Sequence, residues 1–189
     1  MKRLTVFLIA VATVVGVLSY KSVAAEETVG EAAPIYGVKI PDGYRDWTLI
    51  SIARVGNPVN DMRAKLGNDL AIKTYREGKL PFPDGTIIAR LAWNQSASEE
   101  NNKVVGAAAL ARGLNPDAVQ KLLSESFVAG PPTNVQFMVK DSKKYAATGG
   151  WGFAQFTNGK PDGEAVHKTC FSCHEPAKDQ DFVFTRYAP

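Results

Sequence analysis

The residues most able to do chemistry lie near the C-terminus, in the pentapeptide CFSCH, residues 170 to 174. Cys170 and Cys173 are the only cysteines of the chain, and His174 is one of two histidines. CxxCH is the attachment motif for c-type haem, in which both thiols bond to the haem and the histidine becomes the proximal iron ligand. We therefore predict one covalent haem c, with Cys170, Cys173 and His174 as cofactor-binding residues and His174 as the metal ligand.

The same two cysteines have other possible uses. In an oxidising compartment they form a disulfide, or a redox-active pair, without any cofactor. A redox pair of the thioredoxin type belongs to a βαβ pattern, with a strand before the motif and a helix after it. A zinc site needs four ligands, and the sequence has no second cluster of cysteines and histidines to complete one. The adjacent His174 therefore favours haem, with a disulfide or redox pair as the alternative.

The N-terminus has the pattern of a secretory signal peptide, residues 1 to 25. A short basic start is followed by an apolar stretch, Leu4 to Leu18, and by small residues that end at Ala25. This order predicts export to the periplasm, with cleavage after Ala25. The alternative is an uncleaved membrane anchor, for which Leu4 to Leu18 is short. We expect residues 26 to 37 to form a flexible leader and residues 38 to 189 to form the folded domain.

The charge balance gives no reason to expect a nucleic acid or an anionic membrane surface as partner. The whole chain has a formal net charge of +3, from 22 Lys and Arg and 19 Asp and Glu residues. Three of the basic residues, Lys2, Arg3 and Lys21, lie in the predicted signal peptide, which contains no acidic residue. The exported chain is therefore neutral overall, and a neutral protein has no general attraction to polyanions.

Hydrophobic periodicity predicts strands separated by short helices. The expected strands are 44 to 55, 62 to 67, 86 to 93, 133 to 140 and 149 to 156. The expected helices are 69 to 78, 103 to 112, 116 to 127, 141 to 148 and 161 to 175. Asn68 and Asp141 are expected to cap two of these helices, and the chain is expected to close as a strand or extended tail over 181 to 187. A sheet-rich layout differs from the helical one of ordinary small c-type cytochromes.

Six stretches of the chain together resemble the cytochrome P-460 family, which includes the cytochromes c′-beta. They occur in the family's order: IPDGYRDW (40–47), PDGTIIAR (83–90), VKDSKKYA (139–146), GGWGFAQF (149–156), CFSCH (170–174) and FVFTRY (182–187). The resemblance implies an α+β fold, mainly antiparallel β-sheet with short helices packed around one c-type haem. It also implies an open distal face of the haem and a homodimer. Residues 96 to 131 are expected to be an insertion relative to the compact members.

Two positions bear on which of the family's two chemistries this chain has. The resemblance implies hydroxylamine oxidation where a lysine is bonded to the haem macrocycle, and binding of nitric oxide or carbon monoxide in the cytochromes c′-beta. Arg90 stands at the position of that lysine, and a guanidinium stays protonated and is a poor nucleophile. Gln136 stands at the position of a proton-relaying carboxylate, and an amide does not titrate. Arg90 and Gln136 are our catalytic candidates, with hydrogen bonding to a ligand as their expected role; Lys73 or Lys79 is an alternative source of a haem-bonded lysine.

Several other residues have an expected place around the haem. Arg186, in FTRY, is expected to bind the cofactor through the haem or a propionate. His167 is expected to be a structural or surface histidine rather than a second ligand. Met62 and Met138 are the methionines available as a sixth ligand, and we favour core packing for Met138. Aromatic cover of the haem is expected from among Phe137, Trp151, Phe153 and Phe156.

The sequence as a whole predicts a periplasmic monohaem cytochrome whose five-coordinate iron binds nitric oxide or a related small nitrogen oxide. Its expected partners are this ligand, a periplasmic electron-transfer protein and a second copy of the chain. Two alternatives stay open among haem proteins: an enzyme that oxidises hydroxylamine, and a six-coordinate electron-transfer cytochrome with a methionine ligand. A disulfide-bonded binding domain without haem is the alternative outside them.

Overall fold

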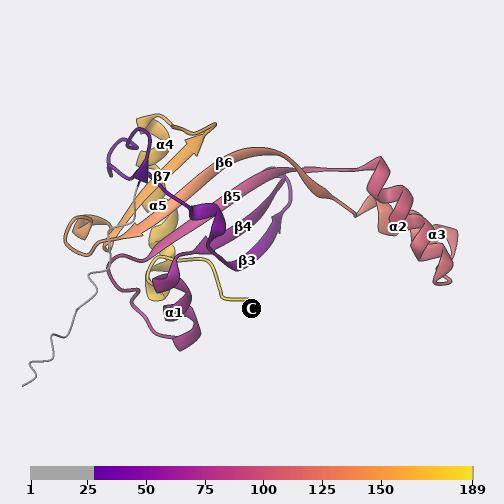
Figure 1. The fold of residues 1–189 in the computed structure, drawn as a ribbon, viewed down its shortest axis with the longest axis horizontal. Helices are drawn as coiled ribbons and strands as arrows, with labels where there is room; N and C mark the ends of the chain where they lie inside the picture. Colours follow the sequence, from indigo (N-terminus) through magenta and orange to yellow (C-terminus); the bar gives the residue numbers. More distant parts are fainter. Residues whose placement is uncertain (1–27, 189) are drawn as a thin grey trace, which may run out of the picture.

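The computed structural model describes residues 28 to 188, and its main element is a six-stranded antiparallel sheet (Figure 1). Successive strands of the chain are neighbours, so the sheet order is β3-β4-β5-β6-β7-β8. These strands are β3 (Thr48–Val55), β4 (Asp61–Gly67), β5 (Ile87–Ser96), β6 (Val128–Lys140), β7 (Trp151–Thr157) and β8 (Lys160–Pro161). A separate ladder joins β1 (Thr28–Val29) to β2 (Ile40–Pro41). The predicted α+β, mainly antiparallel fold class is confirmed.

The helices are short, and α1 (Asp69–Glu77) has the end signals that the sequence predicts. The Asn68 side chain accepts a hydrogen bond from the Ala71 amide at the start of α1, and Gly78 ends the helix in the left-handed conformation, φ 62°. The other α-helices are α2 (Glu99–Ala111), α3 (Pro116–Ser124), α4 (Glu164–Lys168) and α5 (Cys170–His174). Three 3-10 helices are η1 (Tyr44–Asp46), η2 (Ala146–Thr148) and η3 (Glu175–Gln180).

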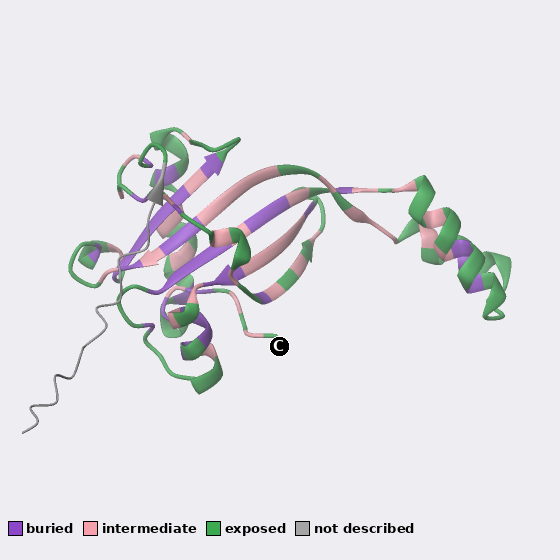
Figure 2. Ribbon diagram, viewed as in Figure 1, coloured by how far each residue is buried: buried purple, intermediate pink, exposed green. Residues whose placement is uncertain are grey.

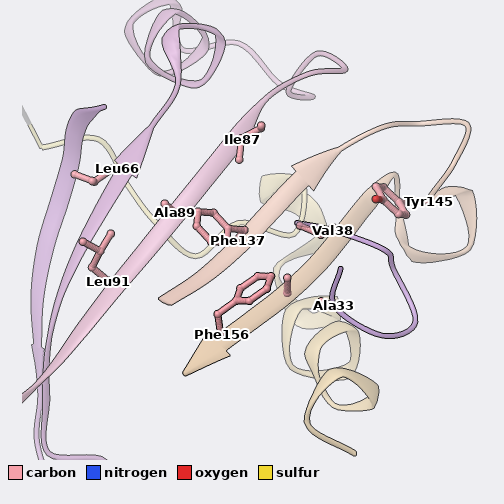
Figure 3. Packing of buried hydrophobic residues seen from close by; sticks show 10 residues of the cluster. Ala33, Val38, Leu66, Ile87, Ala89, Leu91, Phe137, Tyr145 and Phe156 are labelled. Carbon is pink, nitrogen blue, oxygen red and sulfur yellow. The ribbon is translucent and has the colours of Figure 1, made fainter. Parts of the chain in front are cut away.

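Alternation along the central strands divides the side chains of the sheet between two packed faces. On β5, Ile87, Ala89 and Leu91 belong to the cluster on the first face, which Figure 3 shows. Ile88 belongs to a second cluster, which also contains residues of α1 and of the C-terminal segment around α5. Because Arg90 shares the alternation of Ile88, its side chain is directed to this second face. The candidate site therefore lies between the sheet and the C-terminal segment.

The segment before β2 packs on the first face of the sheet. Ala33 is 2% exposed and Val38 is 4% exposed, and both belong to the first cluster (Figure 3). Residues 33 to 37 therefore differ from the flexible leader expected over 26 to 37, because the sheet has an apolar face that this segment covers. The predicted signal peptide, residues 1 to 25, lies outside the described residues.

An arm projects from the sheet between β5 and β6. These strands continue as a narrow ribbon, and α2 and α3 pack against each other at its tip, clear of the sheet (Figure 1). The helices approach closely at Gly106, where an added Cβ would lie 3.2 Å from a Leu123 methyl carbon. Most of the arm is exposed (Figure 2), including Val104 and Leu122. The segment 96 to 131, expected as an insertion, thus forms a helical hairpin on a β-ribbon.

Two predicted elements around β6 differ from the structure. The strand expected over 133 to 140 begins earlier in the structure, because AGPP, residues 129 to 132, also belongs to β6. The ribbon pairs irregularly there, with register shifts beside Trp93. The two prolines, which have no backbone N–H to donate, are therefore tolerated in the strand. Asp141 caps no α-helix; its carboxylate accepts hydrogen bonds from the Lys143 and Lys144 amides and forms a turn instead.

The C-terminal part of the chain is helical only in short pieces. The helix predicted over 161 to 175 is divided at Thr169 into α4 and α5. Residues 181 to 187 form no strand and pass across the second face as a tail, the second of the two forms expected. None of the described helices has the length and the apolar character needed to cross a membrane.

Candidate functional site

The CFSCH motif forms helix α5, which packs beside the second face of the sheet (Figure 1). Cys170 and Cys173 are three residues apart and so lie on the same side of this helix. Both thiols are free; Cys170 is half-buried and Cys173 is exposed. Burial raises the pKa of the Cys170 thiol, and the nearby Cys173 raises it further. A raised pKa makes the Cys170 thiol less reactive, because the thiolate is the nucleophilic form.

The side chain of His174 is fixed by contacts on three sides. Its Nδ1 donates a 2.8 Å hydrogen bond to the backbone carbonyl of Phe182. Its ring lies between those of Phe153 and Phe184, with centroids 4.9 Å and 4.8 Å away. Burial lowers the pKa of His174, which favours the neutral imidazole. With the proton on Nδ1, the lone pair of Nε2 is available to a metal, as in metal-binding histidines.

A buried ion pair holds the tail that supplies the carbonyl partner of His174. Lys140, on β6, lies 2.7 Å from one carboxylate oxygen of Asp181 and 2.9 Å from the other. Lys140 also donates to the Gly149 carbonyl at 3.0 Å, and the Asp181 carboxylate accepts from the Phe82 amide at 2.9 Å. Asp181 and Phe182 both have left-handed backbones, φ 51° and 64°, a conformation that is unfavourable for residues other than glycine. The ion pair offsets this conformational cost.

A cavity of about 590 Å³ lies between His174 and the sheet. Besides His174, residues from four strands and from the tail line it: Ser51, Ile52, Arg63, Lys65, Ile88, Arg90, Gln136, Phe137, Met138, Val183, Phe184, Thr185 and Arg186. The cavity brings Arg90, Gln136 and Arg186 together with His174, although the four residues are far apart in the sequence. The residues selected from the sequence as ligand, catalytic candidates and cofactor contact thus share one space.

The strand wall of the cavity carries an ionic cluster around Asp61, which is 5% exposed. The Asp61 carboxylate accepts a 2.8 Å hydrogen bond from Arg63 and a 2.6 Å hydrogen bond from Arg90. Arg90 also donates to the side-chain oxygen of Asn134 at 3.0 Å. Its Nε is buried and has no hydrogen-bond partner among the described residues. Arg90 is therefore held rigidly at the wall of the cavity.

Lys65, on β4, is a site residue that the sequence analysis missed. It lies directly opposite Arg90 in the β4–β5 pairing and lines the same cavity. Burial lowers the pKa of Lys65, and the neighbouring Arg63 and Arg90 lower it further. The alternation of the charged residues Asp61, Arg63 and Lys65 with apolar residues in β4 was a signal that the charged ones face one side. The pairing of β4 with β5, which brings them to Arg90, is not visible in the sequence.

Gln136 lies opposite Arg90 on one side and opposite Gln155 on the other. Its side-chain amide donates to the side-chain oxygen of Gln155, whose own amide donates to the carboxylate of Asp162. This chain fixes the orientation of Gln136 and leaves its carbonyl oxygen without a partner among the described residues. Gln136 is thus a fixed polar group on the cavity wall, and Asp162 lies at the far end of its hydrogen-bond chain.

The histidine and methionine candidates for a second ligand differ in position. His167 is fully buried, with Nε2 accepting from the Gln155 amide and Nδ1 bonded to the Gly163 carbonyl, so both ring nitrogens are occupied. His167 is therefore structural, as expected. Met138 is buried and lines the cavity, whereas Met62 alternates with the cavity residues of β4 and points to the other face.

The aromatic and lysine candidates also differ in where they lie. Phe137 and Phe156 pack in the first cluster (Figure 3), while Trp151 and Phe153 pack in the second, next to the site. Aromatic contact with His174 comes from Phe153 and also from Phe184, which the sequence analysis did not select. Lys73 is an exposed residue of α1, and Lys79 is exposed and pairs with Glu77. Lys65 is the one lysine, among the described residues, that lines the cavity.

Comparison with models of known protein families shows to which family the chain belongs. A family model described as Cytochrome P460 matches residues 41 to 185, most of the chain. The chain belongs to the cytochrome P460 family. Comparison with curated proteins gives no match. Membership of a haem-binding family identifies the group for which the site is built.

The residues of the site fit a haem. The cavity has a volume within the range of roughly 300 to 1,000 Å³ that ligand and cofactor sites have. His174 would hold the iron through Nε2, and Arg186, which lines the cavity, would bind a propionate. When bound, a haem supplies an iron centre that takes small ligands and exchanges electrons.

Proposed function

We propose that this protein is a monohaem c-type cytochrome that binds nitric oxide or a related small nitrogen oxide at a five-coordinate iron. The observation that carries the proposal is the orientation of His174. Its Nδ1 is bound to the Phe182 carbonyl, and its Nε2 is left for a metal beside a cavity of about 590 Å³. An imidazole held in this way supports one axial bond to the iron.

Covalent attachment through Cys170 and Cys173 supports the assignment as a c-type protein. Both thiols are free and lie on one side of α5, whose last residue is His174. A thioether bond from each cysteine would fix the haem next to the histidine. Arg186, at the cavity, is proposed to bind a propionate.

Arg90 and Gln136 are proposed to act on the bound ligand by hydrogen bonding. Arg90 is anchored by Asp61 and Asn134 and lines the cavity. Gln136 is anchored through Gln155. Neither group titrates near neutral pH, so both are suited to hold a ligand rather than to remove protons from a substrate.

Hydroxylamine oxidation is the second candidate, and one observation favours it. Lys65 lines the cavity, and its pKa is lowered by burial and by two neighbouring arginines. A lysine with a lowered pKa is a better nucleophile, and the resemblance implies a haem-bonded lysine in the hydroxylamine-oxidising members. In this candidate the haem-bonded lysine is therefore Lys65, on the neighbouring strand β4, and not a residue at the position of Arg90.

We also propose the compartment and the partners of the protein. Export to the periplasm is supported by the signal-peptide pattern of residues 1 to 25. In that compartment we propose a periplasmic electron-transfer protein as redox partner and a homodimer as the functional assembly. A third candidate, a six-coordinate cytochrome, has Met138 as its ligand, because Met62 points away from the cavity.

Intact mass under denaturing conditions tests the attachment. The exported protein is to be expressed with the haem maturation machinery and compared with a Cys170→Ser, Cys173→Ser double variant. We expect the mass of the chain plus one haem for the parent and of the chain alone for the variant. Loss of the haem from the denatured parent protein would contradict the c-type assignment. Digestion into peptides separates the two candidates, because a haem-bonded lysine would join the CFSCH peptide to the Lys65 peptide.

A further inference from the structure

The strand wall of the cavity carries more positive charge than its carboxylates balance. Arg63, Lys65 and Arg90 lie on the adjacent strands β4 and β5, and Arg186 joins them from the tail. Among the described residues, the carboxylate that pairs with this group is Asp61, which binds Arg63 and Arg90. The group therefore has four cations and one carboxylate, and the carboxylate pairs with two of the four. A haem with two ionised propionates at this cavity leaves the group positive.

Two of these cations have donors that nothing in the described part of the chain satisfies. No carboxylate there forms an ion pair with Lys65. The Nε of Arg90 is buried without a hydrogen-bond partner. An unsatisfied buried donor is costly, and a half-buried ammonium between two guanidinium groups is also unfavourable. The second of these costs is relieved when an anion binds in the cavity beside Lys65.

We propose that the wall formed by Arg63, Lys65 and Arg90 is an anion site, and that the protein binds a small anionic nitrogen oxide at this wall of the cavity. The inference rests on the proposed function and names its ligand class: an oxyanion such as nitrite rather than only a neutral diatomic gas. Asp61 fixes the two arginines and leaves Lys65 as the cation whose charge is free for the ligand.

Charge distinguishes the two classes of ligand. A neutral diatomic molecule gains at most a hydrogen bond from Arg90 or Gln136. An oxyanion also gains a charge-assisted hydrogen bond from Lys65, and such bonds are about twice as strong as those between neutral groups. Removal of the Lys65 charge is therefore expected to weaken nitrite binding roughly 10- to 100-fold and to leave binding of a neutral gas unchanged.

The test is a pair of spectrophotometric titrations of the haem-loaded protein. The ferric protein is titrated with sodium nitrite, and the ferrous protein is titrated with carbon monoxide as the neutral ligand. The variants are Lys65→Gln and Lys65→Arg, which keeps the charge. Lys103→Gln is the matched control, because it removes the same charge from the exposed face of α2. Haem content is measured for each variant before titration.

We expect weaker nitrite binding in Lys65→Gln, near-parental binding in Lys65→Arg and no change in Lys103→Gln, with carbon monoxide affinity alike in all four proteins. Nitrite affinity in Lys65→Gln equal to that of the parent would overturn the anion site. An equal loss of nitrite and carbon monoxide affinity would overturn it too, because the effect would then come from the shape of the cavity. If the parent binds neither ligand, the proposed function itself fails. Carbon monoxide binding without nitrite binding in the parent removes the anion site alone.

Discussion

The buried ion pair between Lys140 and Asp181 gives the most quantitative prediction for this fold. The Lys140 side chain is 6% exposed and that of Asp181 is 8% exposed, so neither charge is solvated if its partner is removed. The Asp181→Asn substitution keeps the shape of the side chain and removes its charge. Removing one member of a buried pair costs about 3 to 5 kcal/mol. For a domain of this size, 1 kcal/mol corresponds to about 2 to 4 °C in Tm, so we expect a loss of roughly 6 to 20 °C.

Thermal unfolding of the haem-loaded protein, followed by circular dichroism, measures this loss. The matched control is Glu77→Gln, which breaks the exposed pair between Glu77 and Lys79 and is expected to leave Tm unchanged. The double variant Lys140→Met, Asp181→Asn removes both charges, and we expect it to lose less than the two single variants lose together. If Asp181→Asn is no less stable than Glu77→Gln, the reasoning about the buried pair is refuted.

Three further predictions concern the site and the arm. In His174→Gly, we expect mass spectrometry to show that haem stays attached through Cys170 and Cys173. Added imidazole is expected to change the visible spectrum of this variant, because it fills the vacant ligand position. A spectrum that does not respond to imidazole would contradict the assignment of His174. Because the pKa of Lys65 is lowered by burial, Arg63 and Arg90 and is raised only by Asp61, its charge is lost as pH rises through a value below 10.5. The nitrite affinity of the parent is therefore expected to fall over that range relative to that of Lys65→Arg, and parallel curves would count against a role for this amine. Replacement of residues 97 to 126 by Asn-Gly is expected to leave the visible spectrum unchanged, because α2 and α3 pack on each other; loss of haem from the shortened chain would show that the arm supports the site.

Local features of the site were predictable from the sequence, because they depend on near neighbours. The CFSCH motif determines which residues share α5, whatever surrounds it. The caps of α1, Asn68 and Gly78, are likewise signals that act within one helical turn. Arg90, Gln136 and Arg186 were selected through the family resemblance, and the fold brings them to one cavity.

Features that depend on distant pairing were not predictable. Lys65 was missed because its place beside Arg90 follows from the β4–β5 register, which no local pattern of the sequence specifies. The packing of residues 33 to 37 follows from an apolar sheet face that forms only when β5, β6 and β7 are paired. The buried position of Lys140 is unusual for a lysine, and it depends on Asp181, 41 positions further along the chain.

The measurement that tests the central claim most directly is the visible spectrum of the purified ferrous protein, with and without carbon monoxide. A five-coordinate iron held by His174 predicts an ordinary high-spin c-type spectrum that shifts when carbon monoxide is added. A low-spin spectrum that carbon monoxide leaves unchanged would contradict the account, because it would show that a side chain such as Met138 fills the sixth position. A strongly red-shifted ferrous band would show a macrocycle modified by the protein and would favour hydroxylamine oxidation over ligand binding.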